Sequence, residues 1–463
     1  MTHRFALRAT LARVVVALVL AAPALAAQRA SSTADVDRLI DAAVRDSAGY
    51  RRLAEMVDTF GNRPSGSSRL EHAIDWIVAE MKKDGLENVH TEPVMVPHWE
   101  RGAESATLLS PRRARIAMLG LGRSVGTPEG GITAPVLVVR DFADLRAHAR
   151  EARGKIVLFD YPFRQDLPPF QAYDDAVRYR AVGADSAAAV GAVAMLLRSV
   201  ASYSMQTPHT GSMIYQDSTR RIPAAAVSVE AAEMLHRMQD RGDSIVVHLE
   251  MGARTLPPAP SRNVVAELRG SEHPEQVVVL GGHIDSWDVG QGAMDDGGGS
   301  VAAWEAVRLM KTLGIRPRRT IRVVLWTNEE SGTAGGRAYR DAHRAELANH
   351  VLALESDNGV FTPRGIRVTG SDHAVETLRR IAAPLARIGA GNVVAGDPEA
   401  DVSPIVALGV PGAALDIDGS RYFWYHHSEA DTIDKLDAHE MALCVATMGA
   451  IALGAADLEG QIR

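Results

Sequence analysis

The second half of the chain repeats one pattern, in which a short apolar run is followed by a polar loop and a helical stretch. The apolar runs span 277–280, 321–326 and 351–354, and a helix is expected over 301–313, ended by Gly314. Apolar runs of this length are typical of strands buried on both faces of a parallel sheet. The pattern therefore predicts an α/β fold in which helices flank a mainly parallel central sheet.

Acidic residues and histidines follow these runs directly. They are His283 and Asp285 after the first run, Asp295 and Asp296 before the expected helix, Glu329 and Glu330 after the second run, Asp357 after the third, and His426 and His427 near the C-terminus. Ligands of open α/β sheets bind beyond the carboxyl ends of the strands, so these side chains are expected to lie close together. Taken singly, each motif also fits a structural role, such as an N-cap or acids in the first turn of a helix.

Taken together, these residues favour a metal site with nitrogen and oxygen ligands. The single cysteine, Cys444, is expected in the core of a C-terminal helix and cannot form an internal disulfide. Ligands without thiolates fit a hydrolytic zinc pair better than a structural zinc site. Two Zn²⁺ ions against the charges of Asp295, Glu330 and Asp357 leave an excess positive charge that favours a bridging hydroxide. Such a pair lowers the pKa of its water and polarises a carbonyl oxygen.

Composition excludes several other classes of protein. The 463 residues are 46% hydrophobic and 23% charged, as in soluble globular proteins. This length favours two domains, or one domain with a large insertion. The net charge of −7 provides no basic field for binding nucleic acid.

Residues 1–26 have the layout of a secretory signal peptide. Three arginines lead into an apolar stretch over 14–22, and Ala24-Leu25-Ala26 forms a small-residue cleavage site. The apolar stretch is short for a spanning helix, which disfavours an uncleaved anchor. Removal of this segment changes the net charge from −7 to −10. We therefore predict a secreted or periplasmic protein that is free of the membrane after cleavage.

Changes in local composition and in the spacing of apolar residues predict the domain boundaries. Residues 27–126 are assigned to the N-terminal part of the main domain, with room for a pro-segment at its start. Over 127–251, short apolar strands alternate with Ala-rich helical stretches, which predicts a smaller inserted α/β domain. The Pro-rich segment 252–262 is expected to be a linker. Residues 263–463 then carry the metal site.

Several longer motifs in the chain resemble those of a known protein family. The stretch 282–299, the segments 198–202 and 207–211, Leu325-Trp326-Thr327 and His426-His427-Ser428 resemble the co-catalytic zinc peptidases that include bacterial aminopeptidases, glutamate carboxypeptidase and the transferrin receptor ectodomain. The resemblance runs from about Gly61 to the C-terminus. It implies a zinc-exopeptidase-like fold in which a protease-associated-like insertion covers the cleft.

The resemblance also implies a role for each site residue. His283 and Asp357 would hold one zinc, Glu330 and His427 the other, and Asp295 would bridge the two zinc ions. Glu329 would be the general base that takes a proton from the bridging water and passes it to the leaving amine. As supporting residues, Asp285 would orient His283, and Asp296 would follow Asp295 across a cis peptide bond.

The expected activity is hydrolysis of short unblocked peptides by a dipeptidase or carboxypeptidase. An aminopeptidase with the same metal centre is the close alternative. A receptor-like binding protein is disfavoured because all six metal and base residues are present. His209 and His426 are candidates for substrate binding, with a turn residue and a packed neighbour as the respective alternatives. Relatives are often dimers, so a homodimer is expected.

Overall fold

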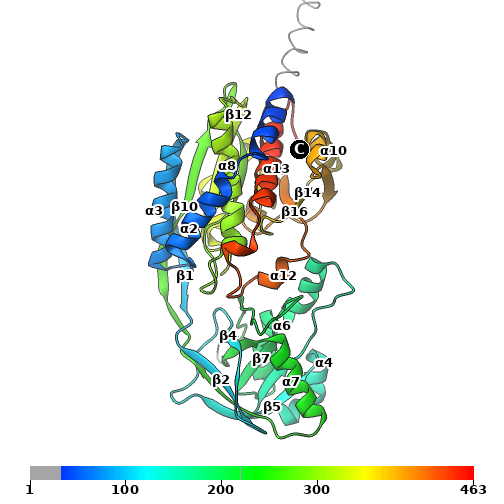
Figure 1. The fold of residues 1–463 in the computed structure, drawn as a ribbon. Helices are drawn as coiled ribbons and strands as arrows, with labels where there is room; N and C mark the ends of the chain where they lie inside the picture. The colour runs from blue at the N-terminus through cyan, green and yellow to red at the C-terminus, as the bar shows by residue number, and fades with distance from the viewer. Residues whose placement is uncertain (1–32, 219) are drawn as a thin grey trace, which may run out of the picture.

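The computed structural model describes residues 33–218 and 220–463, so the predicted signal peptide lies outside the described residues. These residues form two eight-stranded sheets, one in each half of an elongated molecule (Figure 1). The first sheet carries the strands that sequence analysis assigned to the main domain. The second sheet lies in the other half, together with α4, α6 and α7.

The first sheet has a parallel centre. Its strands, in spatial order, are β1 (Glu87–Glu100), β10 (Arg254–Leu268), β12 (Arg319–Trp326), β11 (His273–His283), β13 (His350–Glu355), β16 (Gly412–Ile417), β14 (Pro363–Thr369) and β15 (Asn392–Ala395). The neighbours β12, β11, β13 and β16 run parallel, whereas the flanking strands β10 and β14 run antiparallel to β12 and β16, respectively. The predicted α/β fold with a mainly parallel central sheet is confirmed.

Helices cover this sheet because their apolar faces need burial. They are α2 (Ala48–Phe60), α3 (Ser68–Lys83), α8 (Gly299–Thr312), α9 (Ala334–Ala342), α10 (Asp372–Ala382), α11 (Ser403–Val406) and α13 (Ala438–Asp457). The short helix α12 (Tyr422–Tyr425) lies instead between the two halves of the molecule (Figure 1). Of the helices in the described part of the chain, α13 alone has the length and apolar character of a membrane span. It packs instead against α8 and β11, with 78% of its most apolar window buried, so it is a core helix.

The second sheet is built in the same way. Its strands, in spatial order, are β3 (Ala114–Ile116), β2 (Glu104–Ser110), β9 (Val246–Met251), β5 (Ile132–Val139), β6 (Ile156–Phe159), β7 (Ala194–Arg198), β8 (Ala224–Val227) and β4 (Met118–Gly120). The strands β5 to β8 run parallel. The helices are α4 (Phe142–Ala147), α5 (Ala149–Ala152), α6 (Pro169–Ala189) and α7 (Val229–Asp240). We call residues 101–253 the insertion.

Two long strands connect the insertion to the first sheet. Three strands of the second sheet lie within 104–120, before the expected start of the inserted domain at residue 127. Most of the expected linker 252–262 lies in β10, which pairs with β1 from Glu87 to Glu100. The Pro-rich part of β10 has β1 alone as its neighbour, because β12 pairs only from Val264 onward. Proline is tolerated there because that side of the strand needs no hydrogen-bond donors.

Candidate metal centre

His283 ends β11 and points into a cluster of carboxylates. Its ring is fully buried, and Nε2 lies 3.0 Å from Asp357 Oδ1 and 3.3 Å from Asp295 Oδ1. The other ring nitrogen, Nδ1, is 2.9 Å from the backbone carbonyl of Asp285. A proton on Nδ1 satisfies that contact, so Nε2, on the side of the carboxylates, is the ring nitrogen that could bind a metal.

Asp295 lies between two histidines. While Oδ1 faces His283, Oδ2 is 3.2 Å from His427 Nε2 and 3.7 Å from His426 Nε2. The peptide bond to Asp296 is cis, as the family resemblance implied. The Asp296 carboxylate accepts backbone hydrogen bonds from His283 and Gly299, both at 3.0 Å. Asp296 therefore supports the backbone around the cluster, while Asp295 offers both oxygens to it.

Glu330 and the two C-terminal histidines complete the second half of the cluster. Glu330 Oε2 lies 3.1 Å from His427 Nε2, and Glu330 Oε1 is buried without a hydrogen-bond partner among the described residues. The His426 ring stacks on that of His427 with a centroid distance of 3.5 Å. Two sets of potential ligands thus converge, one around His283 and Asp357 and one around His427, and Asp295 lies next to both.

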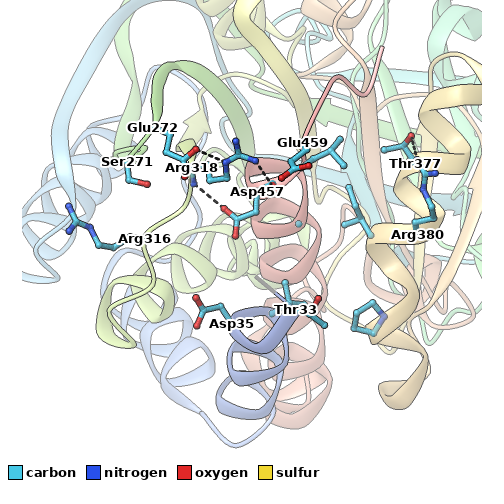
Figure 2. A pocket seen from close by; sticks show the side chains of 15 residues that line it. Thr33, Asp35, Ser271, Glu272, Arg316, Arg318, Thr377, Arg380, Asp457 and Glu459 are labelled. Atoms are coloured by element: carbon cyan, nitrogen blue, oxygen red, sulfur yellow. Dashed lines mark hydrogen bonds and ion pairs between the residues drawn. The ribbon is translucent and has the colours of Figure 1, made fainter. Parts of the chain in front are cut away.

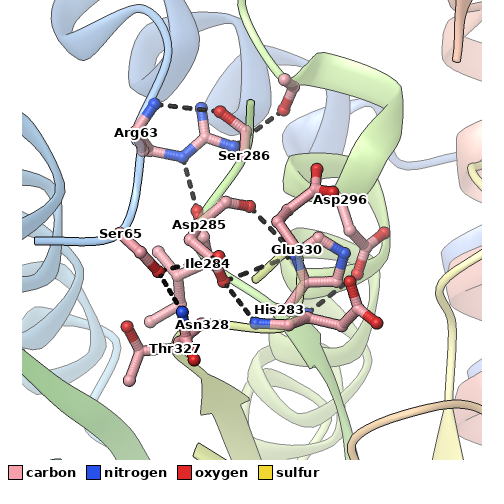
Figure 3. A network of polar contacts seen from close by, with 12 residues as sticks. Arg63, Ser65, His283, Ile284, Asp285, Ser286, Asp296, Thr327, Asn328 and Glu330 are labelled. Atoms are coloured by element: carbon pink, nitrogen blue, oxygen red, sulfur yellow. Dashed lines mark hydrogen bonds and ion pairs between the residues drawn. The ribbon is translucent and has the colours of Figure 1, made fainter. Parts of the chain in front are cut away.

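Glu329 is held beside these ligands by Asp285. Asp285 Oδ1 accepts a hydrogen bond from the Glu329 backbone N–H at 3.0 Å, and Oδ2 accepts one from Ser65 at 3.2 Å. Its carboxylate is 3.7 Å from His283 Nδ1, farther away than its own backbone carbonyl. Asp285 thus orients His283 through its main chain, while its side chain positions the segment that carries Glu329 (Figure 3).

Two residues that sequence analysis did not single out shape the loop before Asp295. The Arg63 side chain is fully buried and donates to four backbone carbonyls, three of them in 284–292 (Figure 3). Asp431 accepts backbone hydrogen bonds from Ala293, Met294 and Asp295 at 2.7–3.2 Å. The sequence signal near Asp431 was the motif His426-His427-Ser428, and sequence analysis described no motif around Arg63.

The insertion also reaches this cluster. Ser212 Oγ donates to the Glu330 carbonyl at 2.8 Å, and Thr210 N donates to the His427 carbonyl at 2.8 Å. The His209 ring next to Thr210 is 2% exposed, and neither of its nitrogens has a hydrogen-bond partner among the described residues. Burial lowers the pKa of His209 to about 3, so this ring is neutral.

A cleft of about 440 Å³ opens onto the cluster. Asp295, Glu329, Glu330, Asp357, His426 and His427 line it together with residues of α6 and α12. A cavity of about 700 Å³ elsewhere is lined by apolar residues and by charged side chains of both signs, some of which pair with one another (Figure 2). In that cavity Arg318 contacts Glu272 at 2.8 Å and donates its backbone N–H to Asp457 at 3.0 Å. The cluster of unbalanced acids at the cleft is therefore the candidate site.

The electrostatics of the cluster favour divalent cations. Burial raises the pKa of Glu329, Glu330 and Asp357, and neighbouring carboxylates add to the effect. Carboxylates crowded in this way are stable in their charged form only if positive charge compensates them. Oxygen and imidazole donors without thiolates suit zinc at a hydrolytic site. The donor set therefore fits a metal centre.

Comparison with known proteins decides the family. The model for peptidase family M28 matches residues 263–452. Carboxypeptidase Q from Mus musculus is 48% identical over 89% of this chain and 86% of its own length, and carboxypeptidase Q from Homo sapiens is 48% identical over 89% and 85%. The chain belongs to peptidase family M28. The predicted family resemblance and the prediction of a zinc-dependent metallo-exopeptidase are confirmed at this level.

Solved structures agree with this fold. The M28 peptidase precursor from Shewanella amazonensis superposes with a TM-score of 0.89 at 35% identity, over 94% of this chain and 99% of that chain. A zinc aminopeptidase from Bacillus subtilis superposes with a TM-score of 0.65 at 20% identity, over 89% of this chain and 95% of that chain. This second structure therefore shares the fold of both halves of the molecule, including the insertion.

Proposed function

We propose that this M28 peptidase hydrolyses short unblocked peptides at a centre of two zinc ions. His283 and Asp357 would hold one ion, and Glu330 and His427 the other, with Asp295 between them. The observation that carries this assignment is that the two oxygens of Asp295 face different histidines, at 3.3 and 3.2 Å. When bound, such a pair lowers the pKa of a water and polarises the peptide carbonyl.

Glu329 is assigned the proton-transfer role. Its side chain lines the cleft beside Glu330, and its backbone is held by Asp285. Burial, with the charge of Asp357, raises its pKa above that of a free glutamate. A general base with a raised pKa can take a proton from water and return it to the leaving amine near neutral pH. Glu329 and Glu330 are adjacent, so one can act on protons while the other binds metal.

The preferred substrate is a dipeptide or another short peptide with free ends. Support comes from the small volume of the cleft, about 440 Å³, and from the relatives named carboxypeptidase Q. An aminopeptidase is the second candidate, because the similar structure from Bacillus subtilis is named a zinc aminopeptidase. Both activities use the same centre and differ in which end of the peptide is anchored.

The test is release of amino acids from one dipeptide in four forms: free, N-acetylated, C-amidated and blocked at both ends. The zinc-loaded protein is expected to cleave the free form, and a chelator should abolish cleavage. Cleavage of the amidated form at an equal rate would favour the aminopeptidase instead. If zinc binds but no form is cleaved in a chelator-sensitive way, the proposed peptidase activity is wrong.

Export and dimer formation complete the proposal. Residues 1–26 are proposed to be removed during export to the periplasm or the medium. Mass spectrometry of the mature protein should therefore find an N-terminus near residue 27. The proposed homodimer predicts twice the mass of the chain in light scattering, and a monomer at micromolar concentration would contradict it.

A further inference from the structure

An ion pair joins the insertion to the loop that leads from β11 to Asp295. Arg101 is the first residue of the insertion, and Asp288 lies in the loop. Arg101 Nε donates to Asp288 Oδ2 at 2.8 Å, and Nη2 donates to Asp288 Oδ1 at 2.6 Å. These two parallel bonds fix the relative orientation of the two groups, because the planar guanidinium and the carboxylate must be aligned to form both.

Arg101 is itself held within the insertion. Its Nη1 donates to the Gly120 carbonyl and lies 3.5 Å from Glu104 Oε1, and its Nη2 also contacts the Thr210 hydroxyl at 3.4 Å. The Arg101 side chain is 9% exposed, and that of Asp288 is 19% exposed. Because the pair is largely shielded from water, loss of either partner would leave a charge without compensation. The position of Asp288 is therefore tied to the insertion.

The neighbouring residue, Trp287, contacts both the insertion and a proposed metal ligand. Trp287 is 6% exposed, and its ring meets the His427 imidazole edge to face, with centroids 5.5 Å apart. On the side of the insertion, Gly122 comes so close that a Cβ atom there would lie 2.0 Å from Trp287 Cη2. Only glycine leaves room for the indole at this position, so the insertion restricts where the ring can lie.

His427 depends on contacts of this kind because of its own backbone. Its φ of +59° lies in the left-handed region, which residues other than glycine rarely adopt. Thr210 N donates to its carbonyl at 2.8 Å, and the rings of His426 and Trp287 pack against its ring. Neighbours of a metal-binding histidine fix the orientation of its ring, and their loss typically lowers metal affinity by about 10- to 100-fold.

We propose that the ion pair of Arg101 and Asp288 positions the proposed metal ligand His427. The pair acts through Trp287, so that the imidazole is held in its ligating position when the insertion is docked on the first half of the molecule. This inference rests on the proposed function and deepens it, because it gives the insertion a part in metal binding that is separate from contact with substrate. The competing explanation is that the pair only stabilises the interface between the two halves.

The test is zinc affinity, measured with the metal alone. The zinc-loaded protein is equilibrated with increasing concentrations of a chelator of known affinity, and the zinc that remains bound is measured. Arg101→Gln and Asp288→Asn each remove one partner of the pair, and the double variant removes both. Gly122→Ala keeps the pair and displaces the indole from the side of the insertion. Thermal unfolding in excess chelator is recorded for each protein, and kcat and KM for alanyl-alanine are recorded at several zinc concentrations.

The matched control is Arg52→Gln, which breaks a similar pair elsewhere. Arg52 forms two parallel bonds with Asp84, at 2.7 and 2.9 Å, and the side chains are 16% and 12% exposed. As Arg101 does with Glu104, Arg52 contacts a second carboxylate, that of Glu305. This pair joins α2 to the residue that follows α3, away from the insertion (Figure 1). Its loss should lower stability without a change in zinc affinity.

We expect Arg101→Gln, Asp288→Asn and Gly122→Ala each to lower the affinity for one of the two proposed zinc ions by about 10-fold or more. The other ion should keep its wild-type affinity. The double variant should lose no more than the larger single loss, because both substitutions remove the same contact. In these variants kcat should fall at low zinc and recover in excess zinc, while KM stays unchanged.

Wild-type zinc affinity in a folded Arg101→Gln and in Gly122→Ala would overturn the inference. An equal loss of affinity in Arg52→Gln would also overturn it, because the effect would then be one of general stability. If Arg101→Gln does not fold, Asp288→Asn and Gly122→Ala decide in its place.

Zinc binding and peptide cleavage separate this inference from the proposed function. If the variants bind zinc more weakly but the wild type cleaves no peptide, the positioning role stands and the proposed activity is wrong. If peptides are cleaved and the variants bind zinc as tightly as the wild type, the inference is wrong and the proposed function stands.

Discussion

The two sheets of the molecule share an architecture but treat the charges at their strand ends differently. Each sheet has four adjacent parallel strands, and in each sheet acidic residues follow some of these strands. In the insertion, Asp160 follows β6 and is bound by Arg198 at 3.0 Å and by His236 at 2.5 Å. The negative charge of Asp160 is therefore compensated by side chains of the insertion itself, and these contacts stabilise its fold.

In the first sheet the corresponding acids lack such compensation. Glu329 and Glu330 follow β12 and Asp357 follows β13, and they face one another, Asp295 and histidine side chains across the cleft. Burial raises the pKa of all three strand-end acids. The comparison teaches that the fold alone does not make a metal centre. What distinguishes the candidate metal centre is that its buried carboxylates outnumber the positively charged side chains around them.

The largest expected effect comes from removing the residue between the two sets of ligands. Asp295→Ala should lower bound zinc from the proposed two ions per chain to one or none and abolish peptide hydrolysis. Elemental analysis of the purified protein measures this directly. Full zinc occupancy in the variant would show that Asp295 is not needed to hold either ion, and the contrast between the sheets would lose its main support.

The next effect separates proton transfer from metal binding. Glu329→Gln should retain both zinc ions but lose at least ~10²-fold in kcat, because an amide cannot accept the proton. Steady-state kinetics combined with elemental analysis tests both parts. A kcat close to that of the wild type would remove Glu329 from the reaction, and loss of zinc would make it a ligand instead.

In the insertion, the matching substitution should affect stability and leave the metal in place. Asp160→Asn leaves Arg198 with a weaker partner, so the free energy of unfolding should fall by about 1–3 kcal/mol. Urea unfolding gives the change, and zinc content should remain at the wild-type value. Asp243→Asn is the control, because Asp243 pairs with the exposed Arg241 and should have little effect. Loss of zinc in Asp160→Asn would contradict the division between the sheets.

The smallest effect concerns the opposite end of the first sheet. His350 begins β13, and burial lowers its pKa from 6.5 to about 4, so the folded protein keeps it neutral. The unfolded chain binds a proton at this residue below pH 6.5, so stability falls as the pH decreases and the loss levels off near pH 4. Between pH 7 and 5.5 this contribution is about 1 kcal/mol. Urea unfolding at both pH values should show it, and His350→Gln should remove it.

Residues at strand ends were predictable because the pattern that produces them is local. His283, Glu330 and Asp357 each follow an apolar run, so their place in the sheet follows from the run. The parallel strands of the insertion were recognised in the same way. Asp285 was found by this rule too, but its contact with the Glu329 backbone depends on how two strands are placed side by side.

Residues whose contacts join distant segments were not predictable. Arg63 bonds to carbonyls more than 200 residues away, and nothing near it in the sequence signals those partners. Arg180 lies on a helix of the insertion and meets His427, 247 positions later in the chain, only in the folded molecule. The prolines of 252–262 predicted a linker, because the sequence does not show that one side of β10 is free.

The paired strands β1 and β10 have a consequence for how such a molecule can change over evolution. Glu100 and Arg254 are register partners, so the chain leaves for the insertion and returns from it at adjacent positions. Exchange of residues 101–253 for another segment would leave the strand order of the first sheet as it is. The proposed ligands of the metal centre all lie outside this stretch, whereas α6, which lines part of the cleft, lies inside it. Exchange of this one segment can therefore change the substrate preference of such a peptidase, while the residues proposed for hydrolysis stay the same.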